Sequence, residues 1–260
     1  MTDIKMIALD IDGTLLNDNK EITSWTKNQI RKAQHAGITV VLCTGRPFPH
    51  CHTYIQDLQL HSHSITCNGG QIYAVDHSVM IEHLFDAATL ANLYHFAQGL
   101  GMNTWTISTK EAYYNDLPEN CSAYQWLKFS CSHKDEEVLN KMAEKVQSID
   151  GVEVSNRTAF TVEVNPTGVN KAAALEWVCE KLGITMKHVM AIGDSLNDIK
   201  MIQSAGIGIA MGNAQKAVQQ VADAITDTNN NDGVGKAIEK FIFGGEWRLC
   251  IGEKYACKDD

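Results

Sequence analysis

Hydrophobic and polar positions in the first part of the chain predict strands that alternate with a helix. Nearly continuous apolar runs occupy residues 4–9 and 38–43, and between them apolar side chains recur at roughly helical spacing from residue 24 to the stop signal Gly37. Strands that are apolar on both faces are buried on both, and two such strands joined by a helix form a parallel unit. With a short strand at residues 64–67, this segment predicts the start of an open parallel sheet.

From Gly69 to Pro166 the pattern changes to strands and helices in mixed order. A hairpin over residues 71–75 and 79–84 opens this segment. Mixed order is typical of an α+β unit rather than of a parallel sheet. The remaining predicted elements are helices at residues 87–100 and 134–148 and strands at residues 103–107, 111–115, 152–155 and 160–164.

After Pro166 strands and helices alternate again. The simplest fold class is therefore α/β, a doubly wound parallel-sheet core interrupted by an inserted α+β domain. We expect a core of residues 1–83 and 166–243, an insertion of residues 84–165 and a tail of residues 244–260. The predicted elements after the insertion are helices at residues 170–182, 196–205, 214–221 and up to about 241, and strands at residues 189–192, 207–210 and 224–226.

The charge balance limits the partners of this chain. Its 22 Lys and Arg residues face 31 Asp and Glu residues, which gives a formal net charge of −9, and no basic run is present. Nucleic-acid binding depends on neutralising phosphates with Lys and Arg, so we expect no nucleic-acid partner. A phosphorylated small molecule would also be repelled, and its site would need a local cation.

Targeting signals and cysteine spacing predict a cytoplasmic protein. The amino terminus lacks the basic and apolar regions of a signal peptide, and no apolar run reaches the length of a membrane span, so no membrane partner is expected. The 8 cysteines show no CxxC pair, which favours free thiols in a reducing compartment. The alternative is a disulfide between Cys250 and Cys257 in the tail.

Two aspartates follow the first predicted strand, where open parallel sheets place their ligands. Asp10 and Asp12 occupy alternate positions of the segment DIDGT, residues 10–14. In a purely structural interpretation Asp10 ends the strand, and Asp12 forms a turn with Gly13. In a chemical interpretation one carboxylate is a nucleophile and the other exchanges protons.

A second acidic segment, GDSLND at residues 193–198, also follows an apolar strand and opens a helix. Asp194 and Asp198 could serve only to cap that helix and complement its dipole. However, acidic segments at the ends of two parallel strands converge on one crevice. Clustered carboxylates repel one another unless a hard divalent cation joins them, so the pair of segments predicts a metal site.

Three further residues suit a phosphate group in the same crevice. Thr44 and Gly45 end the second strand and supply a hydroxyl and a backbone N–H, and Lys171 stands at the entry of a helix. Most single lysines are solvated surface residues, and this alternative stays open for Lys171.

These segments resemble the four motifs of the haloacid dehalogenase (HAD) superfamily, and within it the Cof-type phosphatases with a C2-type α/β cap. DIDGT matches the DxDGT motif, CTGR at residues 43–46 matches the phosphate-binding motif, Lys171 matches the lysine, and GDSLND matches the acidic motif. The resemblance covers about residues 4–240. It implies a HAD-like Rossmannoid core, with residues 84–165 as the cap that determines substrate specificity.

The resemblance implies a role for each matching residue. Asp10 would be the nucleophile, Asp12 the acid and base, and Lys171 a third catalytic residue. Mg²⁺ is implied as cofactor, held by the carboxylates of Asp10 and Asp194 and the backbone carbonyl of Asp12. The implied further members are Ser195 and Asp198 at the metal, Ile11 (through its backbone), Thr44, Gly45, Lys171 and Asn197 at the phosphate, and Arg46 and Asn68 at the substrate. A tight hairpin turn explains Asn68 and Gly69 equally well.

The implied function is Mg²⁺-dependent hydrolysis of small phosphomonoesters through an aspartyl phosphate. Mg²⁺ would lower the pKa of Asp10, whereas Asp12 must titrate higher in order to donate a proton. One alternative is a phosphomutase of the same superfamily, which would depend on a bisphosphorylated activator. Another is a non-catalytic phosphometabolite sensor, which would be expected to lack one of Asp10, Asp12 and Lys171.

A dinucleotide-binding module is a further alternative because Gly206, Gly208 and Gly212 form a glycine-rich run. The spacing is GxGxxxG rather than GxGxxG, and the run enters a late strand instead of following the first. Close packing near the crevice is the simpler interpretation of these glycines.

The sequence leaves the substrate open. Sugar phosphates are the family expectation, with flavin mononucleotide and pyridoxal phosphate as alternatives. Aromatic and histidine residues of the insertion and its border could contact the leaving group or belong to the core: His83, Trp105, Tyr113, Tyr114 and Trp126. The oligomeric state is equally open between a monomer and a small homo-oligomer.

Overall fold

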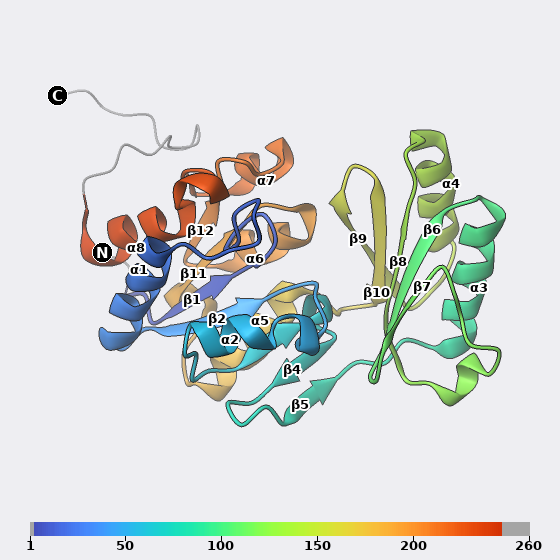
Figure 1. Cartoon of the computed structure of the whole chain (residues 1–260), viewed down its shortest axis with the longest axis horizontal. Coiled ribbons are helices and arrows are strands. Elements are labelled where there is room, and N and C mark those ends of the chain that lie inside the picture. Colours follow the sequence, from blue (N-terminus) through green and yellow to red (C-terminus); the bar gives the residue numbers. More distant parts are fainter. Residues whose placement is uncertain (1–2, 246–260) are drawn as a thin grey trace.

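The computed structural model describes residues 3–245, apart from the side chains of residues 155–157. Figure 1 shows two units side by side, each built on its own β-sheet. We call the unit that runs from helix α3 (Ala87–Gly99) to strand β10 (Thr161–Pro166) the cap, and the rest the core. The chain leaves the core after strand β5 (Val79–Glu82), forms the cap and returns to the core in helix α5 (Lys171–Lys181), as an inserted domain predicts. The predicted α/β fold class is confirmed.

The core sheet is parallel from β13 through β3, and β4 and β5 then add an antiparallel hairpin at one edge. Its central strands are buried on both faces, which explains their uninterrupted apolar sequence. In spatial order the strands are β13 (Ala224–Ile225), β12 (Ile207–Ala210), β11 (Val189–Gly193), β1 (Met6–Leu9), β2 (Thr39–Cys43), β3 (Ser64–Thr66), β4 (Gln71–Tyr73) and β5 (Val79–Glu82).

Helices cover both faces of the core sheet (Figure 1). Helix α1 packs on α8, and α5 packs on α6. Helix α1 begins after Thr23, whose hydroxyl accepts a hydrogen bond from the N–H of Thr26, and α5 is capped in the same way by Asn170. The core helices are α1 (Ser24–His35), α2 (His52–Asp57), α5 (Lys171–Lys181), α6 (Ile199–Ser204), α7 (Lys216–Val221) and α8 (Gly233–Phe243).

The cap is an antiparallel sheet with two helices on one face. Apolar side chains such as Phe129, Val162 and Val164 point toward α3 and α4 and form a second hydrophobic core with them. Polar side chains alternate with these and form the opposite face. The cap elements are the helices α3 (Ala87–Gly99) and α4 (Glu136–Gln147) and, in spatial order, the strands β7 (Ala112–Tyr114), β6 (Asn103–Ser108), β8 (Trp126–Ser132), β10 (Thr161–Pro166) and β9 (Val152–Thr158).

One strand and one α-helix of the structure were not predicted from the sequence. Strand β8 lies at the centre of the cap sheet, between β6 and β10, and α2 is a short helix of the core. The helix predicted at residues 196–205 is also shorter, because a 3₁₀ turn at Leu196–Asp198 precedes α6. The other predicted strands and helices are confirmed, with shifts of a few residues at their ends.

Close packing explains the glycine-rich run. A Cβ at Gly206 would lie 2.0 Å from the carbonyl oxygen of Lys187, and a Cβ at Gly208 would lie 2.1 Å from that of Ile202. These glycines therefore allow β12 to lie close to its neighbours. Because close packing explains them, they no longer indicate a dinucleotide-binding module.

The described part of the chain contains free cysteines at positions 43, 51, 67, 121, 131 and 179. The alternative disulfide between Cys250 and Cys257 lies outside the described residues. Within residues 3–245, every helix is too short or too polar to cross a bilayer.

Candidate active site

The carboxyl ends of four parallel strands bring the predicted site residues together. Asp10 follows β1, Thr44 follows β2, Asn68 lies just beyond β3, and Asp194 follows β11. These strands are neighbours in the sheet, so their ends meet at one edge. Ile11 turns its side chain into the core and is fully buried.

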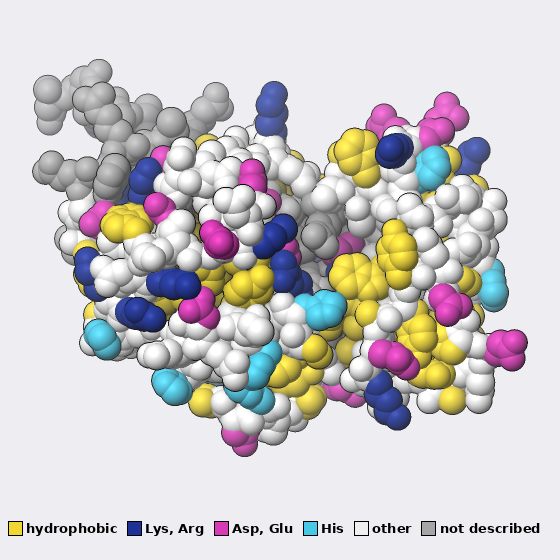
Figure 2. All heavy atoms as spheres, in the orientation of Figure 1, with side chains coloured by type: hydrophobic (Ala, Val, Ile, Leu, Met, Phe, Trp, Pro, Cys, Tyr) yellow, Lys and Arg dark blue, Asp and Glu magenta, His cyan; other side chains and the backbone are white. Residues whose placement is uncertain are grey.

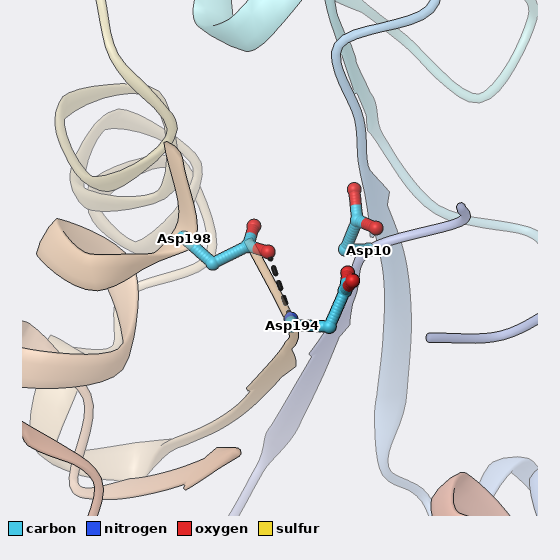
Figure 3. A group of neighbouring side chains, drawn as sticks. All are labelled: Asp10, Asp194 and Asp198. Carbon is cyan, nitrogen blue, oxygen red and sulfur yellow. Dashed lines mark hydrogen bonds between the residues drawn. The ribbon is translucent and has the colours of Figure 1, made fainter. Parts of the chain in front are cut away.

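Three carboxylates form a compact cluster at this edge. Oxygens of Asp10, Asp194 and Asp198 all lie within 4.8 Å of one another. Figure 3 shows the carboxyl groups of Asp10 and Asp194 close together, whereas Asp198 turns one oxygen to the N–H of Asp194 at 3.0 Å. Gly13, with φ +78°, makes room for this cluster, because a Cβ there would lie 2.4 Å from Oδ2 of Asp194.

Lys171 joins two members of the carboxylate cluster. Its Nζ atom lies 2.6 Å from Oδ1 of Asp10 and 2.6 Å from Oδ1 of Asp198. The side chain is fully buried at the start of α5, which excludes the surface-lysine alternative. Burial alone would lower the pKa of Lys171, but the neighbouring carboxylates of Asp10 and Asp198 raise it above its usual range. The lysine is therefore a fixed positive charge.

Two hydroxyl groups hold the carboxylate of Asp194, and Asp198 holds the backbone of the same loop. Thr14 Oγ1 and Ser195 Oγ each donate to it at 3.2 Å, to Oδ1 and Oδ2 respectively. Asp198 Oδ2 accepts the backbone N–H of both Asp194 and Ser195, each at 3.0 Å. Asp198 thus holds both the backbone of residues 194–195 and the ammonium group of Lys171.

The protein groups alone leave an excess of negative charge in the cluster. Burial raises the pKa of Asp10 to about 8, with Asp198 and Asp194 adding repulsion and Lys171 opposing it. Burial, followed by repulsion from Asp198, raises the pKa of Asp194 to about 6. Buried carboxylate oxygens that repel one another at this distance are the donor set of a hard divalent cation, so the residues fit a metal ion.

Asp12 lies apart from the carboxylate cluster and pairs with Arg46. The guanidinium donates through Nε to Oδ2 at 2.7 Å and through Nη2 to Oδ1 at 2.6 Å, and Lys20 approaches Oδ1 at 3.4 Å. This double hydrogen bond raises the pKa of Arg46. The carboxylate of Asp12 thus contacts two cationic side chains.

A small cavity of about 20 Å³ joins these groups, and one of its walls comes from the cap. That wall is the ring of Trp105 on β6. Figure 2 shows Lys and Arg side chains on the core where it borders the cap, which supplies the local positive charge that an acidic chain needs for a phosphate. The residues that line the cavity are Asp10, Asp12, Thr44, Gly45, Arg46, Trp105, Ser195 and Asn197.

Asn68 serves both as a turn residue and as a contact of the site. It adopts a left-handed conformation with φ 58° in the 3₁₀ turn Cys67–Gly69, as a tight turn requires. Its Oδ1 also accepts a hydrogen bond from Asn197 Nδ2 at 3.0 Å. Its Nδ2 donates to Glu163 of the cap at 2.8 Å.

The other aromatic and histidine candidates of the insertion lie elsewhere. Trp126 is fully buried in the cap core, Tyr113 packs against it, and Tyr114 and His83 are exposed. Sequence reasoning missed Thr14, Lys20, Lys128 and Glu163. Thr14 is part of the DIDGT segment and could have been found there, whereas the other three carry no local signal.

Comparison with known proteins agrees with this arrangement. The family model described as haloacid dehalogenase-like hydrolase matches residues 7–129 and 119–238. The 5-amino-6-(5-phospho-D-ribitylamino)uracil phosphatase YcsE of Bacillus subtilis is 41% identical over 92% of this chain and 96% of its own. The pyridoxal phosphate phosphatase YbhA of Escherichia coli is 28% identical over 90% of this chain and 97% of its own.

A solved structure shares the fold along nearly the whole chain. It is BT1666 of Bacteroides thetaiotaomicron, described among the phosphatases of the HAD enzyme superfamily, with a TM-score of 0.80, 27% identity and coverage of 92% of this chain and 95% of that one. The motifs, the fold and these relatives agree. The chain belongs to the haloacid dehalogenase-like hydrolases, as a phosphatase of the Cof type.

Proposed function

We propose that this protein is a Mg²⁺-dependent phosphatase of small phosphomonoesters that works through an aspartyl phosphate on Asp10. The observation that carries the proposal is the buried arrangement of Asp10, Lys171 and Asp198, with both contacts of Lys171 at 2.6 Å. A carboxylate fixed beside a permanent cation, at the ligand-binding edge of a parallel sheet, is suited to attack phosphorus.

The residues that would hold Mg²⁺ are those of the carboxylate cluster. Asp10 and Asp194 would supply carboxylate oxygens and Asp12 its backbone carbonyl, with Ser195 and Asp198 supporting Asp194. A bound Mg²⁺ would neutralise charge on the phosphate oxygens and keep Asp10 ionised.

In the first step a carboxylate oxygen of Asp10 attacks phosphorus. The new bond joins that oxygen to phosphorus while the ester P–O bond breaks, and a protonated Asp12 gives its proton to the leaving alkoxide. Lys171 and the groups at Thr44, Gly45 and Asn197 hold the phosphoryl oxygens. Because Asp12 is paired with Arg46 in this structure, substrate entry must release Arg46 before Asp12 takes up its proton.

In the second step water hydrolyses the aspartyl phosphate. Asp12, now a carboxylate, accepts a proton from the water as its oxygen bonds to phosphorus. The bond between phosphorus and the Asp10 oxygen breaks, which restores the carboxylate and frees inorganic phosphate.

Sugar phosphates and related esters are the proposed substrates, and 5-amino-6-(5-phospho-D-ribitylamino)uracil is the first to test. The support is the 41% identity to YcsE, together with the indole ring of Trp105 in the wall of the cavity. A flat ring in the leaving group can stack on an indole face.

Phosphate release with and without Mg²⁺ tests the proposal. The panel comprises sugar phosphates, 5-amino-6-(5-phospho-D-ribitylamino)uracil, flavin mononucleotide and pyridoxal phosphate, beside Asp10→Asn as control. We expect Mg²⁺-dependent release that this variant abolishes. Release that persists without any divalent cation, or in Asp10→Asn, would overturn the proposal.

A further inference from the structure

The polar face of the cap sheet contains a buried ion pair. Lys128 on β8 and Glu163 on β10 lie with Nζ 2.8 Å from Oε1, and each side chain is only 2% exposed. Glu163 pairs in register with Ser130, which stands two residues from Lys128, so both charges lie on the face opposite α3 and α4. The cap's own hydrophobic core is thus on the other side of the sheet.

Both members of the ion pair reach across the junction to the core. Lys128 Nζ donates to the carbonyl oxygen of Gly45 at 3.3 Å, and Glu163 Oε2 accepts from Asn68 Nδ2 at 2.8 Å. Asn68 in turn accepts from Asn197 Nδ2 at 3.0 Å. A continuous polar bridge therefore runs from Gly45 through the cap to Asn197.

The two ends of this bridge are walls of the reaction cavity. Gly45 and Asn197 line it together with Asp10. The carbonyl that Lys128 holds belongs to the peptide between Gly45 and Arg46, whose N–H donates to Thr44 Oγ1 at 3.1 Å. Lys128 therefore orients this peptide group, and the peptide group in turn orients the hydroxyl of Thr44.

The other end of the bridge orients an amide. Within the described residues Asn197 Oδ1 has no hydrogen-bond partner, although it is buried. Its Nδ2 donation to Asn68 thus fixes the amide, and Asn68 is itself held by Glu163.

Stability alone does not explain a buried ion pair at this place. Removing two charges from water is energetically costly, and apolar residues of similar size often stabilise a protein as well or better. Apolar contact across the junction is already supplied by Cys67 of the core with Ile107 and Leu127 of the cap, and Trp105 packs against them. The side chains of Lys128 and Glu163 are desolvated only where the cap meets the core. The polar bridge is therefore complete only when the cap is docked on the core.

We propose that Lys128 and Glu163 are positioning residues that complete the phosphate site when the cap docks, by holding the Gly45 peptide and the amide of Asn197. The inference rests on the proposed function for the identity of the phosphate site. It assigns to the cap a part in the geometry of phosphate binding, in addition to contact with the leaving group.

The test compares Lys128→Met, Glu163→Met and the double variant Lys128→Met/Glu163→Met. Lys134→Met is the control, because Lys134 is an exposed lysine of the cap. Three readouts are taken with Mg²⁺: the affinity for inorganic phosphate by calorimetry, kcat and KM for the best substrate, and the midpoint of thermal unfolding.

Each single variant is expected to weaken phosphate binding and to lower kcat, by about tenfold. In the double variant the losses of phosphate affinity and kcat are expected to be no larger than in either single variant, because the bridge acts as a unit. The double variant, which leaves no unpaired charge, is expected to unfold at a higher temperature than either single variant while kcat stays low. Unchanged phosphate affinity in the variants, losses that multiply in the double variant, or recovery of kcat together with stability would overturn the inference. Absence of turnover in the parent protein would refute the proposed function instead. The phosphate affinities of the parent and the variants would still test whether Lys128 and Glu163 position the phosphate site.

Discussion

Two buried lysines of this molecule each hold carboxylates, yet their surroundings differ. Lys171 binds Asp10 and Asp198, and all three belong to the core. Lys128 binds Glu163 within the cap, and both then contact the core. The first group is assembled by the core fold alone, whereas the second is completed only where the cap meets the core. The core lysine is therefore suited to the chemical step and the cap lysine to the geometry of the site.

The largest expected effect comes from the carboxylate that Lys171 holds. Asp10→Asn keeps the size of the side chain but removes the proposed nucleophile, and we expect phosphate release to fall by about 10⁴-fold or more. The measurement is steady-state release with Mg²⁺. Asp76→Asn serves as control, because Asp76 is exposed on a hairpin of the core. A variant with more than about a hundredth of parental activity would remove Asp10 from the role of nucleophile.

Replacement of Lys171 sharpens the comparison with Lys128. Lys171→Met removes the charge that the proposed mechanism places at the phosphoryl oxygens, and we expect kcat to fall by about 10²- to 10³-fold, against the tenfold loss expected for Lys128→Met. Both variants are measured with the same substrate, and circular dichroism checks that each is folded. Equal losses in the two variants would end the distinction between a chemical and a positioning lysine.

The pH dependence of stability tests the carboxylate cluster of the core. In the folded protein without metal, burial raises the pKa of Asp10 to about 8 and that of Asp194 to about 6, above their ordinary value of 3.8. The folded state therefore binds more protons than the unfolded state between about pH 4 and pH 8, and stability falls as pH rises through this window.

Thermal unfolding with EDTA and with Mg²⁺ measures this effect. We expect the midpoint with EDTA to fall from pH 5 to pH 8. Mg²⁺ should raise the midpoint more at pH 8 than at pH 5, because it competes with protons for the carboxylates. An Mg²⁺ effect independent of pH, or one retained in Asp10→Asn/Asp194→Asn, would place the metal elsewhere.

The smallest effect concerns Trp105, the cap residue in the cavity wall. Trp105→Ala is expected to raise KM by about fivefold for substrates with a ring in the leaving group, because stacking is lost, with less change for glycerol phosphate. Trp105→Phe is the matched control and should keep most of the affinity. A rise in KM of the same size for both kinds of substrate would show that Trp105 does not select rings.

The sequence predicted which core residues lie together, because these residues stand at strand ends. Asp10, Thr44 and Asp194 each follow an apolar run, and parallel strands bring such ends together whatever the loops do. The pairing of Asp12 with Arg46 could not be predicted in this way, since it depends on side-chain directions across two loops.

The cap bridge could not be predicted because its parts are distant in the sequence. Lys128 and Glu163 lie on separate strands, and β8 itself was missed although its residues alternate between polar and apolar beyond Leu127. Neither residue belongs to a local motif, and a lone lysine in a strand is usually solvated. Only the pairing of β8 with β10 and the docking of the cap bring the charges together.

Direct detection of the covalent intermediate tests the central proposal. The protein is mixed with Mg²⁺ and its best substrate, quenched in acid within milliseconds, digested and mapped by mass spectrometry. We expect a phosphoryl group on Asp10 that disappears as turnover ends and is absent from Asp10→Asn. A phosphoryl group on another residue, or rapid turnover with Asp10 unmodified at every time point, would contradict it.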